Sequence, residues 1–319
     1  MTFLTLAQVV FLSVLWMQSA PNVSSNPQAS ANPDESLLTL HSAVSEVHLV
    51  FTVTDKNGNY LRSLTQSDFE ILDDLKPPEK ILSFRSETDL PLQVGLVIDI
   101  SQSVRERFTF EQESAIAFLN QTLRPKYDQA FVMGFDMTVK VTQDFTDDTE
   151  RLAAGIHRLQ PGTLTAMYDA VYYACNKLRR ESPNTPVRRV LILLSDGYDN
   201  ASSATRERVI ETAQRAGVSV YTIRTSLTAS GRGPKNLEII ADKTGGRSYV
   251  PTEITGVANA FTAIQTELRS QYAVSYKPAA FKLDGRYRTI QIRTPKQKGL
   301  RTRSRRGYRT TRIADGSDR

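Results

Sequence analysis

Three short polar segments carry the residues of this sequence whose types and spacing could do chemistry. Asp99-Ile100-Ser101-Gln102-Ser103 and Ser195-Asp196-Gly197 each follow an apolar run, and Gly162-Thr163-Leu164-Thr165 precedes a helix predicted to begin at Met167. Carboxylate and hydroxyl oxygens without histidine or cysteine suit Mg²⁺, Mn²⁺ or Ca²⁺ rather than zinc. With so few charged ligands, Mg²⁺ would keep waters and an open coordination position, because it dehydrates reluctantly.

Strands and helices alternate in the part of the chain that must position these segments. Val94-Gly95-Leu96-Val97-Ile98 and residues 190–194 are continuous apolar runs, typical of parallel strands buried on both faces. The other predicted strands are 130–135, 138–142 (an edge strand) and 218–223, and the predicted helices are 106–123, 149–158, 167–180, 205–216, 235–244 and 257–270. This alternation predicts a doubly wound, mostly parallel α/β sheet. Its carboxyl edge would gather all three polar segments at one place.

Short β segments flank this α/β part on both sides. Strands are predicted at 47–53, 69–72 and 80–84 before it, and at 272–276, 287–292 and 300–306 after it. Each flank is too small to bury a good core alone, so we expect both to pair into one small β-sandwich with the α/β domain inserted between them. The predicted boundaries are a signal peptide or anchor at 1–20, a disordered linker at 21–43, the sandwich at 44–90 and 270–312, the α/β domain at 91–269, and a tail at 313–319.

The N-terminus has the length of an export signal. The apolar run from Phe3 to Trp16 predicts a signal peptide, and hence a periplasmic, cell-envelope or extracellular protein. No lysine or arginine precedes Lys56, so an uncleaved membrane-proximal anchor stays open as the alternative. The position of signal cleavage also stays open.

The single cysteine, Cys175, excludes an internal disulfide framework and any CxxC site, and it falls on the apolar face of its predicted helix.

The positive charge of the chain is confined to one segment. The net charge is +6, yet residues 282–312 alone hold twelve lysines and arginines against one acid, Asp284. This basic segment could contact an anionic envelope surface. Arg301, Arg303 and Arg305 alternate with small polar residues like the solvated face of a strand, which protects an edge from aggregation. Aromatic residues are not interleaved as base stacking requires, which argues against nucleic-acid binding.

The three polar segments resemble the metal-ion-dependent adhesion site of von Willebrand factor type A domains. DISQS at 99–103 matches the DxSxS motif, LTAMYDA at 164–170 resembles the threonine loop, and LLSDGYDN at 193–200 resembles the acidic loop. The resemblance covers roughly residues 90–270. It implies that Ser101, Ser103 and Thr165 ligate the metal directly and that Asp99 and Asp196 act mainly through waters. A carboxylate from a partner protein would take the vacant position.

More narrowly, residues 45–308 resemble exported bacterial VWFA-related proteins. The stretches that carry this likeness are VTDKNGNYLRSLTQSDFEILDD, LRSQYAVSYKP and LRTRSRRGYR. The threonine loop departs from that group, which usually has two glycines directly before the threonine. The spacing to Tyr168-Asp169-Ala170 favours Thr165, and Thr163 remains the alternative ligand.

Three functions compete on this sequence. The resemblance favours a non-enzymatic module for adhesion or assembly, without a small-molecule substrate, that binds a partner's Asp or Glu through the metal. A structural envelope component without metal-dependent binding is the second. A metal-assisted hydrolase is the third, and it lacks a Gly-rich phosphate loop, a GxSxG motif and a usable histidine. We expect Asp169 to make a structural hydrogen bond and Asp199 to cap or be solvated, and neither to bind the metal.

Overall fold

The computed structural model describes residues 46–310 except 87–89, 102–107, 181–186, 227–230, 254, 281 and 283. The predicted signal segment, the whole predicted linker, the tail and Ser103 lie outside the described residues. None of the helices in the described ranges has the length and apolar character needed to cross a membrane.

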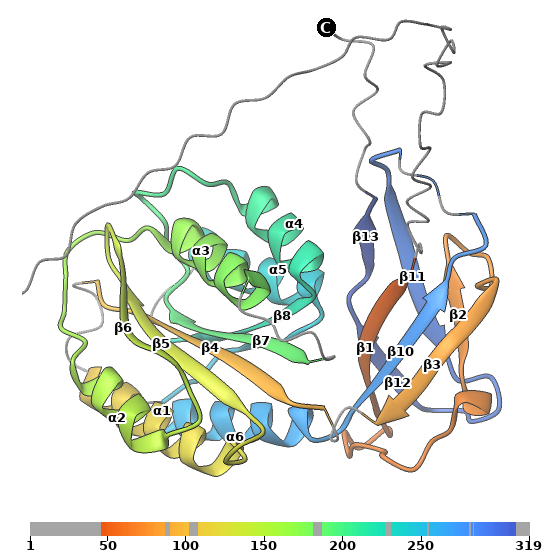
Figure 1. Cartoon of the computed structure of the whole chain (residues 1–319), viewed down its shortest axis with the longest axis horizontal. Coiled ribbons are helices and arrows are strands. Elements are labelled where there is room, and N and C mark those ends of the chain that lie inside the picture. Colours follow the sequence, from red (N-terminus) through yellow and green to blue (C-terminus); the bar gives the residue numbers. More distant parts are fainter. Residues whose placement is uncertain are drawn as a thin grey trace, which may run out of the picture. The chain divides into compact units, whose positions relative to one another are not determined.

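A six-stranded sheet forms the centre of the α/β part (Figure 1). Its strand order is β6-β5-β4-β7-β8-β9, and every neighbouring pair is parallel except β5 and β6. The strands are β4 (Leu92–Asp99), β5 (Gln129–Phe135), β6 (Val139–Thr146), β7 (Arg188–Ser195), β8 (Val218–Arg224) and β9 (Ser248–Tyr249). All residues of β4 are buried, which explains its unbroken apolar sequence.

Three helices cover each face of this sheet, as Figure 1 shows. On one face lie α1 (Phe108–Thr122), α2 (Thr149–His157) and α6 (Gly256–Leu268), and on the other lie α3 (Met167–Arg180), α4 (Arg206–Ala216) and α5 (Arg232–Thr244). Each set packs its apolar stripe on the sheet and forms a separate core cluster. The doubly wound fold predicted from the sequence is therefore confirmed.

Local signals set the ends of these helices. The Thr205 hydroxyl accepts a hydrogen bond from the N–H of Arg208 at the start of α4, and Gly217 ends that helix in the left-handed conformation. The Asp148 carboxylate accepts from the N–H groups of Glu150 and Arg151 at the start of α2.

Cys175 on α3 is fully buried, as its position in the sequence predicted.

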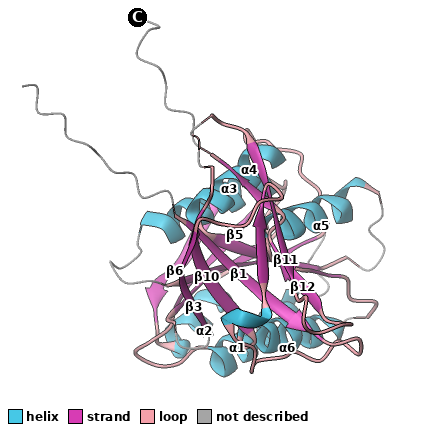
Figure 2. Ribbon diagram, turned by 90° about the vertical axis from the view of Figure 1, so that its right-hand side faces the viewer, coloured by secondary structure: helices cyan, strands magenta, loops and turns pink. Residues whose placement is uncertain are grey.

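The two flanks of the chain build a β-sandwich together (Figure 2). One sheet has the order β12-β1-β10-β3 and the other β13-β11-β2, so each contains strands from before and after the α/β part. The strands are β1 (Val47–Thr54), β2 (Glu70–Asp73), β3 (Lys80–Ser86), β10 (Gln271–Lys277), β11 (Tyr287–Arg293), β12 (Arg301–Ser304) and β13 (Gly307–Arg309). Apolar side chains of both sheets share one core. The insertion predicted from the sequence is confirmed, whereas the boundaries themselves stay predictions.

One predicted strand of the sandwich is shorter in the structure. Residues 300–306 were expected to form a single strand, but β12 ends at Ser304 and pairs with β1, and an unpredicted strand, β13, follows it and pairs with β11 in the other sheet. The backbone turns at Arg305 and Arg306, and Gly307 packs so closely on β11 that a Cβ there would lie 2.1 Å from the carbonyl oxygen of Arg288. The short strand β9 and a 3₁₀ turn, η1 (Gln66–Asp68), were not predicted.

The arginines of this segment are also not the solvated face that their alternation predicted. Arg301 is exposed, but Arg303 and Arg305 are partly buried. The Arg303 guanidinium donates to the carbonyl oxygen of Gly246, and Arg306 forms an ion pair with Asp242 at 3.0 Å. Arg303 and Arg306 therefore hold the sandwich against the α/β part.

Candidate metal centre

The three polar segments lie at the topological switch point of the central sheet. From β4 the strand order runs to β5 on one side and to β7 on the other, and β4 and β7 are parallel neighbours with Ile98 opposite Leu194. The next residues along both strands are therefore Asp99 and Ser195, side by side at the carboxyl edge. A crevice at such an edge is the usual ligand site of open α/β sheets.

Asp99 is the most deeply buried member of the site. Its side chain is fully inaccessible, one carboxylate oxygen accepts from the Ser195 hydroxyl at 2.8 Å, and the other accepts from the N–H of Ser101 at 2.9 Å. Burial raises the pKa of Asp99 to about 6, against the hydrogen bonds from Ser101 and Ser195, and the Asp196 carboxylate raises it further. The two carboxylates are thus close enough to repel each other inside a buried site.

The threonine loop reaches the same place. The N–H of Gly162 donates to the carbonyl oxygen of Ile100, which ties this loop to the segment after β4. Thr165 is buried, its N–H donates to the side-chain oxygen of Asn200 at 3.0 Å, and its carbonyl accepts from the N–H groups of Asn200 and Ala201. Thr163 is exposed. Burial and backbone anchoring favour Thr165 over Thr163 as the residue that faces the site.

The acidic loop follows β7, and it begins with a backbone conformation that only glycine adopts readily. Gly197 has a φ of 84°, and a Cβ there would lie 2.1 Å from the carbonyl oxygen of Gly233 at the start of α5. Its N–H donates to the Ser195 hydroxyl, and the Asp196 carboxylate accepts from the N–H of Tyr198 at 3.0 Å. Asp196 keeps partial solvent exposure, unlike Asp99.

Reciprocal caps lock the acidic loop to α3. The Asp199 carboxylate accepts from the N–H of Tyr168 and from the Ser202 hydroxyl, and that hydroxyl accepts from the N–H of Asp169. In return, the Asp169 carboxylate accepts from the N–H groups of Ser203 and Ala204, both at 2.8 Å. Both aspartates therefore have the structural roles that the sequence predicted.

Two positioning residues, Asn200 and Ser202, were missed by the sequence analysis. Asn200 contacts Thr165 across 35 positions of the chain, and Ser202 contacts Asp169 across 33. No local spacing signals such contacts, because only the folded sheet brings these loops together.

The side-chain types at this edge of the sheet fit a hard divalent cation. Asp99, Ser101, Thr165 and Asp196 come from three loops and offer carboxylate and hydroxyl oxygens, while Ser103 lies outside the described residues. A cation between the two carboxylates would relieve the cost of burying Asp99 in its charged form. Within the described ranges there is no cluster of three or more His, Cys, Asp or Glu that could hold a metal.

The sequence profile of the von Willebrand factor type A domain matches residues 93–263, more than half of the chain. The chain belongs to the von Willebrand factor type A (VWA) domain family. VWA domains serve mostly as adhesion and interaction modules, and those that carry the metal-ion-dependent adhesion site (MIDAS) motif bind a divalent metal. None of the curated proteins matches this sequence.

Several solved structures are similar to the chain. The PilB minor pilin from Streptococcus sanguinis is 16% identical over 57% of this chain and 62% of its own, with a TM-score of 0.46. Proximal thread matrix protein 1 from the mussel byssus, with a zinc-occupied MIDAS motif, is 18% identical over 63% of this chain and 50% of its own, with a TM-score of 0.48. The vWF domain of the type V pili tip protein Mfa5 from Porphyromonas gingivalis is 15% identical over 55% of this chain and 94% of its own, with a TM-score of 0.45.

Proposed function

We propose that this VWA domain is a non-enzymatic adhesion or assembly module that binds a protein partner through a divalent metal at the switch point of its sheet. The observation that supports the proposal is that the three loops are tied together: Ser195 donates to Asp99, the N–H of Gly162 to the carbonyl oxygen of Ile100, and the N–H of Thr165 to Asn200. The resemblance of these loops to the metal-ion-dependent adhesion site supports the assignment.

Each residue has a part in the proposed site. Ser101, Ser103 and Thr165 supply hydroxyl ligands, and Asp99 and Asp196 act mainly through waters. Asp99 is held in place by Ser195, and Thr165 by Asn200. Because these direct ligands are uncharged, a bound ion would retain excess positive charge. That charge would attract and bind the carboxylate of a partner. Mg²⁺ is the proposed ion, with Mn²⁺ and Ca²⁺ as alternatives, since all three prefer oxygen ligands.

A thermal melt tests the metal. The protein is stripped with EDTA, dialysed, and melted with and without excess Mg²⁺, Mn²⁺ or Ca²⁺. A ligand that binds only the folded state stabilises it by about 2.7 kcal/mol at a hundredfold excess over its Kd. We expect such a rise in melting temperature. If none of the ions produces a rise, the adhesion-site assignment fails and a structural envelope role takes its place.

A peptide selection tests the partner. Displayed random peptides are selected on the Mg²⁺-loaded protein and eluted with EDTA. We expect enrichment of peptides with an Asp or Glu, and loss of binding when that residue is changed to Asn or Gln. Selected peptides that bind equally well in EDTA, or without an acidic residue, would contradict carboxylate docking while leaving the metal site intact.

The proposed location is outside the cytoplasm, in the periplasm, the cell envelope or the medium. This rests on the apolar run from Phe3 to Trp16, which has signal-peptide length. Cell fractionation of the expressed protein, followed by N-terminal sequencing, tests the location and the cleavage site together.

A further inference from the structure

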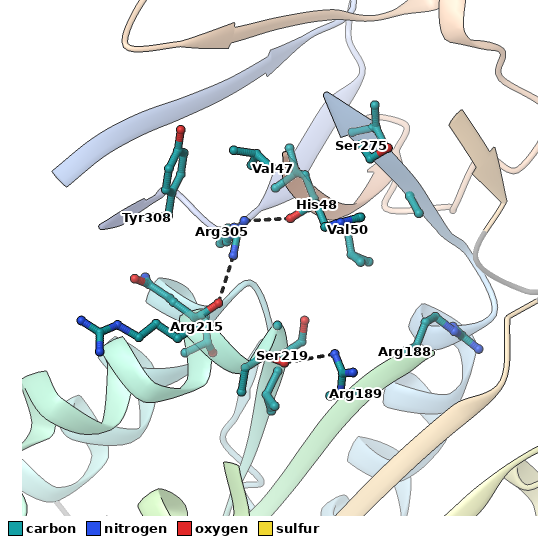
Figure 3. Close-up of a pocket in the computed structure, with 18 of the residues that line it drawn as sticks. Val47, His48, Val50, Arg188, Arg189, Arg215, Ser219, Ser275, Arg305 and Tyr308 are labelled. Atoms are coloured by element: carbon teal, nitrogen blue, oxygen red, sulfur yellow. Dashed lines mark hydrogen bonds between the residues drawn. The ribbon is translucent and has the colours of Figure 1, made fainter. Parts of the chain in front are cut away.

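A cavity of about 850 Å³ lies between the α/β part and the β-sandwich (Figure 3). Its floor includes the residues around the starts of β7 and β8, and its opposite wall comes from β1, β3, β10 and the β12–β13 segment. The starts of the parallel strands are the opposite edge of the sheet from Asp99. This cavity is therefore separate from the candidate metal centre, and its volume is within the range of small-molecule sites.

The walls of this cavity carry a large excess of positive charge. Two glutamates among the described lining residues face six arginines, which are Arg85, Arg188, Arg189, Arg215, Arg305 and Arg309. Both glutamates have partners already, because Glu211 pairs with Arg215 at 2.7 Å and Glu46 lies 3.6 Å from His48. The remaining charge comes from both sides of the cavity, so an occupant could contact the two parts of the protein at once.

Arg305 occupies the middle of the junction. Its guanidinium donates to the carbonyl oxygen of His48 on β1 at 2.7 Å and to that of Gln214 on α4 at 3.4 Å, as Figure 3 shows. Its Nε–H is buried and donates no hydrogen bond to any described residue. Burial lowers the pKa of this guanidinium, so its surroundings do not fully compensate its charge. An anion in the cavity, which Arg305 helps to line, would compensate this charge.

We propose that this cavity binds a small multivalent oxyanion, a molecule carrying two or more phosphate or carboxylate groups. The planar guanidinium fork matches both groups with paired, charge-assisted hydrogen bonds, and this favours such anions over neutral or monovalent ligands. The arginines lie on separate elements, Arg85 on β3, Arg215 on α4 and Arg305 after β12, so one charged group cannot serve them all. The ligand joins the two parts of the chain.

Isothermal titration calorimetry tests this site with three probes: pyrophosphate, citrate and inorganic phosphate. The protein carries Asp99→Asn and is metal-free, so that chelation at the metal centre contributes nothing, and ionic strength is held constant. We expect saturable binding of pyrophosphate or citrate, or of both, and much weaker binding of phosphate. Pyrophosphate alone would identify a phosphate ligand, and citrate alone a polycarboxylate.

Three variants locate the binding. Arg85→Gln and Arg215→Gln change exposed side chains of opposite walls, and each should weaken binding about tenfold through the loss of a charge-assisted contact. Arg305→Gln should abolish it, with the melting temperature reported to separate misfolding from lost affinity. The matched control is Arg151→Gln, an exposed arginine of α2 that does not line the cavity.

Two results would overturn the proposal. The first is the absence of saturable binding of all three probes. The second is an equal effect of Arg151→Gln and of the Arg85 and Arg215 variants, which would mean general charge attraction rather than a site. Neither result bears on the metal centre, which is tested by the melts described above.

Discussion

Burying the charged carboxylate of Asp99 costs folding free energy. Because burial and the nearby Asp196 both oppose its ionisation, the metal-free protein gains nothing from this charge. We therefore predict that Asp99→Asn leaves the metal-free melting temperature equal or higher but removes the rise produced by Mg²⁺. The control is Asp55→Asn, in an exposed turn of the sandwich, which should keep the full rise. A rise that persists in Asp99→Asn would exclude Asp99 from the site.

Cys175 offers a second test at the residue scale. Burial raises the pKa of its thiol to about 12, so almost no thiolate is present at pH 8. We expect the native protein to react with a thiol reagent at pH 8 only as fast as it opens, and to release one thiol equivalent at once in denaturant. Fast, stoichiometric reaction of the native protein would contradict the buried position on α3.

At the scale of elements, the acidic loop depends on Gly197. Alanine there must adopt a left-handed φ and also meet the Gly233 carbonyl oxygen, so we predict a loss of more than about 1–2 kcal/mol in unfolding free energy together with weaker metal binding. Gly58→Ala is the matched control, because Gly58 has a φ of 87° but open space around its Cα. Chemical denaturation should show a clearly smaller loss for Gly58→Ala, and equal losses would mean that the packing on Gly233 does not matter.

The caps of α3 connect the acidic loop to helix stability. Asp199→Ala removes the acceptor of the Tyr168 N–H and should cost about 1 kcal/mol, as should Asp148→Ala at the start of α2. Only Asp199→Ala should also weaken Mg²⁺ binding, since its loop carries Asp196 and Asn200. Melts at increasing Mg²⁺ separate the two effects, and an equal Mg²⁺ response in both variants would show that the caps do not position the site.

Features that neighbouring residues determine could be predicted from the sequence, whereas features that depend on contacts between distant residues could not. The apolar run of β4 and the helix over 205–216 depend on signals within a few residues, and the structure has both close to the predicted positions. Asn200 and Arg303 act on residues far along the chain, and their side-chain types alone point to solvent or to a turn. The end of β12 at Ser304 and the separate strand β13 were missed for the same reason, because pairing with β11 decides where the chain changes sheet.

At the scale of the whole molecule, Glu267 on α6 links the two parts of the chain. Its buried carboxylate accepts from the hydroxyls of Tyr60 and Tyr221, both at 3.0 Å, and lies 3.0 Å from Arg247. Tyr60 follows β1 of the sandwich, whereas Tyr221 is in the central sheet. This one side chain therefore couples the packing of the sandwich to that of the VWA domain.

We predict that Glu267→Ala lowers the unfolding free energy by about 3 kcal/mol, because it removes the acceptor of two tyrosine hydroxyls and the anion beside the half-buried Arg247. Tyr60→Phe should cost about 1 kcal/mol, since it removes a single hydrogen bond. Urea denaturation followed both by fluorescence and by circular dichroism measures these losses. An unchanged midpoint for Glu267→Ala would show that the junction adds nothing to stability.

Because the sandwich is built from both flanks of the chain, it can be completed only after the C-terminal flank has been synthesised. Asp73 and Tyr308, whose hydrogen bond joins β2 and β13, are separated by 235 residues of chain. At ordinary rates of translation, on the order of ten to fifty seconds pass between the synthesis of the two. During that interval the VWA domain can be completed, while Val47, Leu49, Phe51 and Val53 of β1 have no partner strand to cover them. β1, the first strand of the described residues to be made, is thus among the last to find its partners, and until then its apolar side chains need protection from aggregation.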